Sequence, residues 1–159
     1  MPVTVLVLGG SAFAGRAIVE EAVWRGWEVW AFNRGRSGSS DSRATHVVGD
    51  RLDPATLAPV VERDWDLVVD TWSGAPLAVR DSARALADRA ARYVYISSES
   101  VYAPPLPLGV TELSPTVEAS PDLQSGDYAE CKRGAELAVR EAFGERALLA
   151  RAGLILGPH

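Results

Sequence analysis

The sequence predicts an α/β fold with a doubly wound parallel sheet, and three observations support that prediction. Short runs rich in Val, Ile and Leu alternate along the chain with stretches that carry apolar residues at helical spacing. The first of these runs ends at a glycine-rich turn. Because strand–helix–strand connections are almost always right-handed, this order gives parallel strands with helices on both faces. Ligands of such a sheet bind outside the carboxyl ends of its strands.

The first half of the chain is predicted to contain strands at residues 3–8, 28–32 and 45–48 and helices at residues 12–25 and 54–62. The first strand is a continuous apolar run, which is typical of a strand buried on both faces. The first helix has charged residues on one side and apolar residues on the other, and Gly26 ends it. The second and third strands flank a polar loop at residues 33–42. Asp53 is the expected N-cap of the second helix, with Pro54 at its first position.

The second half is predicted to contain strands at residues 66–70, 93–97 and 147–150 and helices at residues 76–90 and 127–143. The earlier helix is inferred from apolar side chains at helical spacing, at Val79, Ala83, Leu86 and Ala90. Residues 99–125 form a long, proline-rich and irregular connection after the fifth strand. Connections of that length are usually functional or disordered, and this one lies where ligands are expected. We expect residues 1–159 to form one domain.

Composition argues against several classes of protein. The net charge of −5 is opposite to the basic surface expected of a nucleic-acid binder. No apolar run approaches the ~20 residues needed to span a bilayer, and the N-terminus has no signal-peptide pattern. Cys131 is the one cysteine, so it forms no internal disulfide, and no Cys/His cluster offers a metal site. We therefore expect a cytoplasmic protein without metal, membrane or nucleic-acid partners.

A glycine-rich turn between the first strand and the first helix predicts a phosphate site. Glycines let the backbone approach a pyrophosphate, which the N–H groups at a helix N-terminus then bind. The three-residue rhythm has Ala12 at its centre, between Gly9 and Gly15. Such a turn can also be only a turn, but its position in a strand-helix alternation favours phosphate binding. The predicted cofactor contacts here are Gly9, Ser11, Ala12, Phe13 and Gly15.

The end of the second strand predicts which dinucleotide binds. NAD-binding folds place an acidic residue there to accept hydrogen bonds from the ribose 2′-hydroxyl. Asn33 stands at that position, and Arg34 and Arg36 follow it. A neutral side chain removes repulsion toward a 2′-phosphate, and guanidinium groups can bind that phosphate. NADP is thus favoured over NAD; the alternative is that both arginines are solvated loop charges.

Tyr128 and Lys132 form a candidate acid/base pair. They are four residues apart in a predicted helix, so they lie on one face within one turn. An ammonium close to a phenol favours the phenolate, and such a pair can exchange a proton with a carbonyl or alcohol oxygen. The spacing alone is also found in half-buried tyrosines beside surface lysines. Two serine hydroxyls at the carboxyl end of the fifth strand, at the place where a substrate oxygen is expected, favour the acid/base interpretation.

Five segments together resemble the extended short-chain dehydrogenase/reductase family, the NAD(P)-dependent epimerase/dehydratase group. They are residues 7–15 (VLGGSAFAG), 47–50 (VVGD), 96–102 (ISSESVY), 128–132 (YAECK) and 151–158 (RAGLILGP). The resemblance implies a Rossmann-like fold in which Ser98 polarises a substrate carbonyl and Tyr128 is the acid/base. It implies that Lys132 also binds the nicotinamide ribose, that Asp50 contacts the adenine, and that Thr71 lies near the cofactor.

The chain departs from the family pattern at Ala12, at Ala152, where a proline is common, and in its length. Ala12 replaces the usual middle glycine, and the chain ends where members of the family continue into a substrate-binding region. We therefore expect a Rossmann-like domain truncated before that region, whose uncovered apolar surface favours self-association into a homo-oligomer.

The expected function is that of an NADP-dependent oxidoreductase or epimerase/dehydratase. It would act on a carbonyl or secondary alcohol of a sugar nucleotide or similar small metabolite. The alternatives are a non-catalytic NADP-binding regulator and a cofactor-binding fragment without activity. The presence of Ser98, Tyr128 and Lys132 together favours the enzyme, because a binding module needs none of their shared geometry.

Overall fold

A six-stranded sheet with strand order β3-β2-β1-β4-β5-β6 forms the centre of the computed structural model, which describes residues 1–36, 41–106 and 108–157. Its strands are β1 (Thr4–Leu8), β2 (Glu28–Asn33), β3 (Thr45–Val48), β4 (Trp65–Asp70), β5 (Ala90–Ser98) and β6 (Ala147–Ala152). The helices are α1 (Phe13–Trp24), α2 (Ala58–Val61), α3 (Pro76–Leu86) and α4 (Tyr128–Phe143). Every neighbouring pair of strands is parallel. The predicted doubly wound, Rossmann-like parallel sheet is therefore confirmed.

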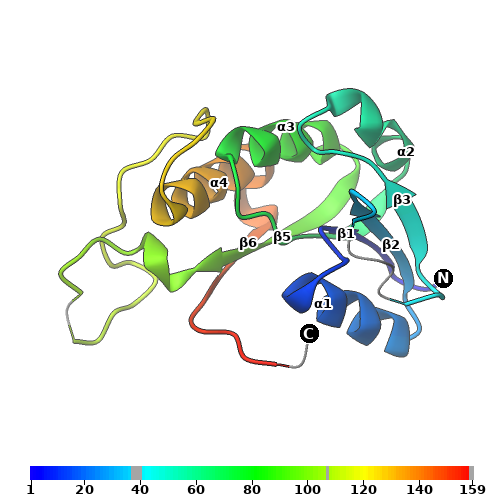
Figure 1. The fold of residues 1–159 in the computed structure, drawn as a ribbon, viewed down its shortest axis with the longest axis horizontal. Coiled ribbons are helices and arrows are strands. Elements are labelled where there is room, and N and C mark those ends of the chain that lie inside the picture. Colours follow the sequence, from blue (N-terminus) through cyan, green and yellow to red (C-terminus); the bar gives the residue numbers. More distant parts are fainter. Residues whose placement is uncertain (37–40, 107, 158–159) are drawn as a thin grey trace.

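Helices cover both faces of the sheet. Figure 1 shows α1 on one face and α2, α3 and α4 on the other. Successive side chains of β1 point to opposite faces of the sheet. Val5 and Val7 pack with α1, whereas Leu6 and Leu8 pack with α3 and α4. All four side chains are fully buried. The continuous apolar run at the start of the sequence is thus explained by burial on both faces.

The strand order reverses beside β1, and this reversal places the site. Leu8 pairs with Phe32 of β2 on one side and with Asp70 of β4 on the other. Chain connections leave the two sides of β1 in opposite directions, so a crevice opens at the carboxyl ends. The turn after β1 is bonded to both neighbours: the N–H of Gly9 donates to the carbonyl of Phe32 at 2.9 Å, and that of Thr71 to the carbonyl of Leu8 at 3.1 Å.

Two predicted helix boundaries were wrong. The helix expected at residues 76–90 ends at Leu86, because Ala90 pairs with Trp65 at the start of β5. The segment expected as one helix at residues 54–62 divides into a 3-10 turn, Pro54–Leu57, and the single turn of α2. Pro59 has no amide hydrogen, so the α-helical bond from that position cannot form. The predicted N-cap is present, with the Asp53 carboxylate accepting from the N–H of Ala55 at 3.1 Å.

Residues 99–106 and 108–125 lie beyond the carboxyl end of β5, before the chain returns to α4 (Figure 1). The segment starts with a 3-10 turn, Glu99–Val101, and has an antiparallel bridge between Tyr102 and Thr116. Arg151 of β6 ties it to the body, since its guanidinium donates to the carbonyl of Glu112 at 3.1 Å and, at 2.8 and 2.9 Å, to the carboxylate of Glu136 on α4. The predicted polar loop at residues 33–42 lies partly outside the described residues. Among the helices described, none is long and apolar enough to cross a membrane.

Candidate active site

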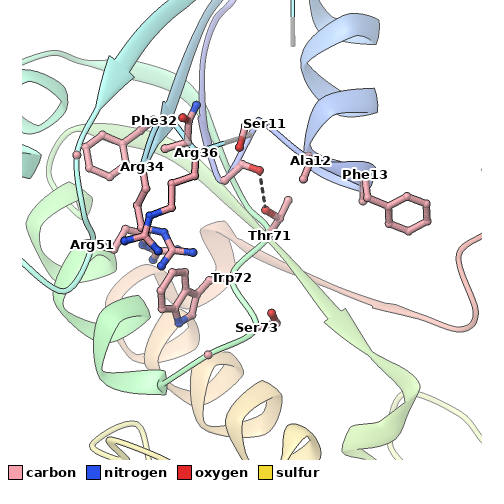
Figure 2. Close-up of a pocket in the computed structure, with 16 residues that line it drawn as sticks. Ser11, Ala12, Phe13, Phe32, Arg34, Arg36, Arg51, Thr71, Trp72 and Ser73 are labelled. Atoms are coloured by element: carbon pink, nitrogen blue, oxygen red, sulfur yellow. Dashed lines mark hydrogen bonds between the residues drawn. The ribbon is translucent and has the colours of Figure 1, made fainter. Parts of the chain in front are cut away.

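A cavity of about 550 Å³ lies at the crevice beside β1 (Figure 2). Its lining contains Gly9, Ser11, Ala12, Phe13, Gly15, Asn33, Arg34 and Thr71, which are eight of the nine predicted cofactor contacts. Asp50, the ninth, lies between two lining residues, Gly49 and Arg51, and its carboxylate accepts a hydrogen bond from the N–H of Leu52 at 3.0 Å. The structure therefore brings together the glycine turn, the end of β2 and the end of β4.

The glycine turn is held close to its neighbours. Gly9 has φ +101°, and a Cβ added there would lie 2.3 Å from Oγ1 of Thr71. A Cβ on Gly15 would lie 2.2 Å from the carbonyl oxygen of Gly9, so only glycine lets α1 start this close to the turn. Ala12 has φ −139°, a region that any residue adopts, and the backbone therefore accommodates the departure from glycine. The first residues of α1, Phe13 to Gly15, line the cavity, and the first N–H groups of a helix have no acceptor within it.

The end of β2 gives the cavity a positive rim. The Asn33 side chain accepts a hydrogen bond from the N–H of Gly35 at 2.8 Å, and this Asx-type bond shapes the turn that carries the two arginines. Arg34 and Arg36 both line the cavity, and their side chains point toward the end where Arg51 and Trp72 lie (Figure 2). Within residues 1–36, 41–106 and 108–157, neither arginine forms an ion pair with an acidic side chain.

A second cavity, of about 450 Å³, holds the three predicted catalytic residues. Ser98 comes from the end of β5, and Tyr128 and Lys132 come from the first turns of α4. The cavity shares four lining residues with the first one: Phe13, Ala14, Thr71 and Ser73. The two cavities thus form one continuous depression across the carboxyl ends of β1, β4 and β5.

The local sequence fixes the start of α4 and so the position of the tyrosine. Asp127 is its N-cap, and the carboxylate accepts from the N–H of Glu130 at 2.8 Å. The Glu130 side chain accepts from the N–H of Asp127 at 3.1 Å, which completes a capping box. Cys131, between the two candidate residues, is buried, and its thiol donates to the carbonyl of Gly126 at 3.6 Å. This contact agrees with a packing role.

The three candidate residues have different surroundings. The Tyr128 side chain is 52 % exposed at the mouth of the cavity, whereas Lys132 is 3 % exposed. The Lys132 ammonium donates to the carbonyls of Trp72 and Ile96, both at 2.8 Å, and lies 5.9 Å from the centre of the Tyr128 ring. Burial lowers the pKa of Lys132 to about 8. The Ser98 hydroxyl donates to the hydroxyl of Ser100 at 3.1 Å.

Sequence reasoning missed two charged residues beneath the first cavity. Arg51 lines the cavity, and its guanidinium binds the fully buried carboxylate of Asp70. The available signal was a carboxylate that directly follows the apolar run Leu67–Val69 at the end of β4. The composition holds another signal, which concerns Lys132. It is the one lysine of the sequence, and the other fifteen of the sixteen Lys and Arg residues are arginine. A chain that uses arginine everywhere else keeps lysine only at the candidate site.

Comparison with known proteins agrees with this geometry. The model of the family described as "NAD dependent epimerase/dehydratase family" matches residues 5–159. The comparison with curated proteins found no matching sequence. Pro158, the last residue of the fifth motif, lies within the matched range but outside the described residues.

Several solved structures have the same fold. The Bordetella bronchiseptica enzyme WbmH in complex with NAD+ is 19% identical, with a TM-score of 0.82, over 99% of this chain and 58% of its own. A UDP-glucose 4-epimerase from Brucella ovis in complex with NAD is 20% identical, with a TM-score of 0.75, over 92% of this chain and 50% of its own. A UDP-galactose 4-epimerase is 22% identical, with a TM-score of 0.73, over 94% of this chain and 55% of its own. The chain therefore spans about half the length of these proteins.

Proposed function

The chain belongs to the NAD dependent epimerase/dehydratase family, and from this premise we propose that it is the cofactor-binding and acid/base part of an NADP-dependent oxidoreductase or epimerase/dehydratase. Its substrate is a carbonyl or secondary alcohol of a small metabolite such as a sugar nucleotide. The observation that carries the proposal is the pair of joined cavities, one along the glycine turn and the other around Ser98, Tyr128 and Lys132.

The residues present fit a nicotinamide dinucleotide. Such a ligand has two nucleotide halves joined by a pyrophosphate, and the two cavities meet at Phe13 and Ala14, in the first turn of α1. Backbone N–H groups at that helix end suit the pyrophosphate. Arg34 and Arg36 at the rim suit a 2′-phosphate, and Asp50 is the proposed contact of the adenine. A nicotinamide ring bound there would supply hydride transfer.

The acid/base work falls to three side chains of the second cavity. Ser98 at the end of β5 donates a hydrogen bond to the substrate oxygen and so polarises it. Tyr128 at the cavity mouth gives a proton to that oxygen or takes one from it. Lys132 lies buried below, where its positive charge favours the phenolate form of the tyrosine and where its ammonium can also hold the nicotinamide ribose.

The experiment that tests the proposal compares the protein with its Tyr128→Phe variant. Because the phenolic proton is the one transferred, we expect turnover of the substrate to fall by about 10²–10⁴-fold. The affinity for NADPH, measured by fluorescence titration, stays within about threefold because the ring itself remains. Tyr102→Phe is the matched control, since Tyr102 is also an aromatic residue next to the site but is not a lining residue of the second cavity.

Two outcomes would contradict the proposal. A Tyr128→Phe variant with near-normal turnover would remove the acid/base role of the tyrosine. NADPH binding without turnover in every variant, the unchanged protein included, would instead identify a cofactor-binding regulator or an inactive fragment.

A further inference from the structure

A buried ion pair joins Arg51, which lines the first cavity, to Asp70 at the end of β4. Arg51 donates from its two terminal nitrogens to the two oxygens of Asp70, at 2.5 and 2.8 Å. Arg51 is 5 % exposed and Asp70 is fully buried. The guanidinium also donates to the hydroxyl of Ser82, and the Tyr93 hydroxyl donates to the Asp70 carboxylate at 2.6 Å. Burying two charges costs about as much as their attraction returns, so stability alone gives little reason for the pair.

The ion pair is bonded directly to the backbone of Trp72. The oxygen of Asp70 that receives the shorter bond from Arg51 also accepts from the N–H of Trp72, at 2.9 Å. The Trp72 indole lies 5.3 Å from the Arg51 guanidinium and donates to the carbonyl of Ala75 at 3.0 Å. The backbone N–H and the indole N–H of Trp72 are therefore both hydrogen-bonded, and Trp72 lines the first cavity together with Arg51 (Figure 2).

The carbonyl of Trp72 is in turn bonded to the second cavity. It accepts from the ammonium of Lys132 and from the hydroxyl of Tyr95, both at 2.8 Å. The ammonium lies 4.9 Å from the centre of the Tyr95 ring. An unbroken series of bonds thus runs from Arg51, through Asp70 and the backbone of Trp72, to Lys132.

We propose that the Arg51–Asp70 ion pair is a positioning device for Lys132. The pair fixes the Trp72 backbone, whose carbonyl holds the ammonium below Tyr128, and it so connects the cofactor cavity to the acid/base cavity. The inference rests on the proposed function, which gives Lys132 its role. Arg51 and Asp70 act through Trp72 and are positioning residues.

The charges around Lys132 allow a change in the ion pair to be followed through the pKa of Lys132. The groups that face its ammonium are Asp70 of β4, Tyr95 of β5, Tyr128 and Glu136 of α4, and Arg51. Burial lowers the pKa of Lys132 to about 8, Asp70 and Glu136 oppose the decrease, and Arg51 adds to it. Removing one member of the ion pair therefore moves the pKa of Lys132 in a known direction.

Because Lys132 is the single lysine, selective labelling with ¹³C,¹⁵N-lysine gives one side-chain signal for an NMR titration. We expect Arg51→Met to raise the pKa of Lys132 above about 8 and Asp70→Asn to lower it. The decrease expected for Asp70→Asn is the more informative result. A general loosening of the structure would expose Lys132 and raise its pKa toward the ordinary value, so it could not produce a decrease. Arg51→Met/Asp70→Leu removes both charges, leaves no buried charge unpaired, and should displace the signal as the ammonium loses its place beside the Tyr95 ring.

Tyr93→Phe is the matched control. It removes a buried hydrogen bond to the other oxygen of Asp70 and leaves the bond to Trp72 in place, so the Lys132 signal and pKa should not change. Arg51→Met changes the titration through loss of charge as well as through position, so the proposal is overturned if the double variant, which removes both charges, gives the same Lys132 signal and titration as Tyr93→Phe. If Asp70→Asn fails to fold, those two variants decide the matter. The titration needs no turnover, so an active Tyr128→Phe enzyme would contradict the proposed function and leave this result standing.

Discussion

Lys132 should make the protein less stable at neutral pH than it is at high pH. Its pKa is about 8 in the folded state and 10.5 when unperturbed, with burial as the main cause. Folding therefore disfavours the charged form: the penalty is fully present below pH 8 and disappears as the pH rises to 10.5. That separation corresponds to about 3 kcal/mol of unfolding free energy. The side chain is only 3 % exposed, so solvent screens little of this effect.

Replacing Lys132 with methionine removes the ionisation and keeps a side chain of similar shape. The Met variant loses the bonds to the carbonyls of Trp72 and Ile96, which changes its stability by a similar amount at every pH. The quantity to follow is thus the difference in unfolding free energy between the two proteins. At pH 7 that difference should be about 3 kcal/mol more in favour of the Met variant than at pH 10.5.

Urea unfolding followed by tryptophan fluorescence measures this difference across the pH range. Lys132→Arg is the control: its guanidinium stays charged throughout, so its stability relative to the Met variant should not change with pH. A difference between the lysine and methionine proteins that stays constant from pH 7 to pH 10.5 would refute the reasoning. It would mean that the pKa of Lys132 is the same in the folded protein as in the unfolded chain, so that burial does not disfavour the ammonium.

Three further predictions concern the cofactor cavity and the helix that carries the tyrosine. Arg34→Ala should weaken NADPH binding by ~10–100-fold in a fluorescence titration and leave NADH binding unchanged. Arg25→Ala, which removes an exposed charge elsewhere, is the control and should leave the affinity for NADPH unchanged. If the unchanged protein binds NADH as tightly as NADPH, the proposed role of Arg34 is wrong. Gly15→Ala should lower the unfolding free energy by about 1–3 kcal/mol, because the new Cβ would lie 2.2 Å from the carbonyl oxygen of Gly9. A stabilised variant would show that the turn yields and that only helix propensity counts. Asp127→Ala should cost about 1 kcal/mol in urea unfolding, whereas Asp127→Asn keeps most of the cap; equal losses would mean that the side-chain bond does not matter.

The sequence predicts the order of elements well because burial on both faces leaves a plain pattern. The apolar run at residues 3–8, ended by Gly9 and Gly10, is typical of a central strand that is buried on both faces. The end of α3 could not be found in the same way. Leu86 and Ala90 are at helical spacing and both are buried, but Ala90 is buried because it pairs in the sheet. The periodicity of a sequence does not separate these two causes of burial.

The candidate site was predictable only where its residues are close in sequence. The spacing of Tyr128 and Lys132 places them on one helix face, and it says nothing of why one is half exposed and the other buried. The buried position of Lys132 goes with its bonds to the carbonyls of Trp72, in the segment after β4, and of Ile96, in β5. Arg51 and Asp70 are nineteen positions apart, Arg51 in the turn after β3 and Asp70 at the end of β4. The sequence indicates neither partner, because β2 and β1 lie between β3 and β4 in the sheet and only the folded chain brings the turn after β3 to the end of β4.

The place of β1 in the sheet has a consequence for how the chain folds. On one side β1 pairs with β2, which follows it closely in sequence. On the other side it pairs with β4, which is distant in sequence, as in the pair of Val5 and Leu67. During synthesis the most apolar strand of the molecule therefore keeps one open edge until β4 has emerged. Pairings between distant segments form slowly, and an open edge of Val and Leu residues is a template for other chains. We therefore expect newly made molecules to be prone to aggregation in the interval before β4 docks.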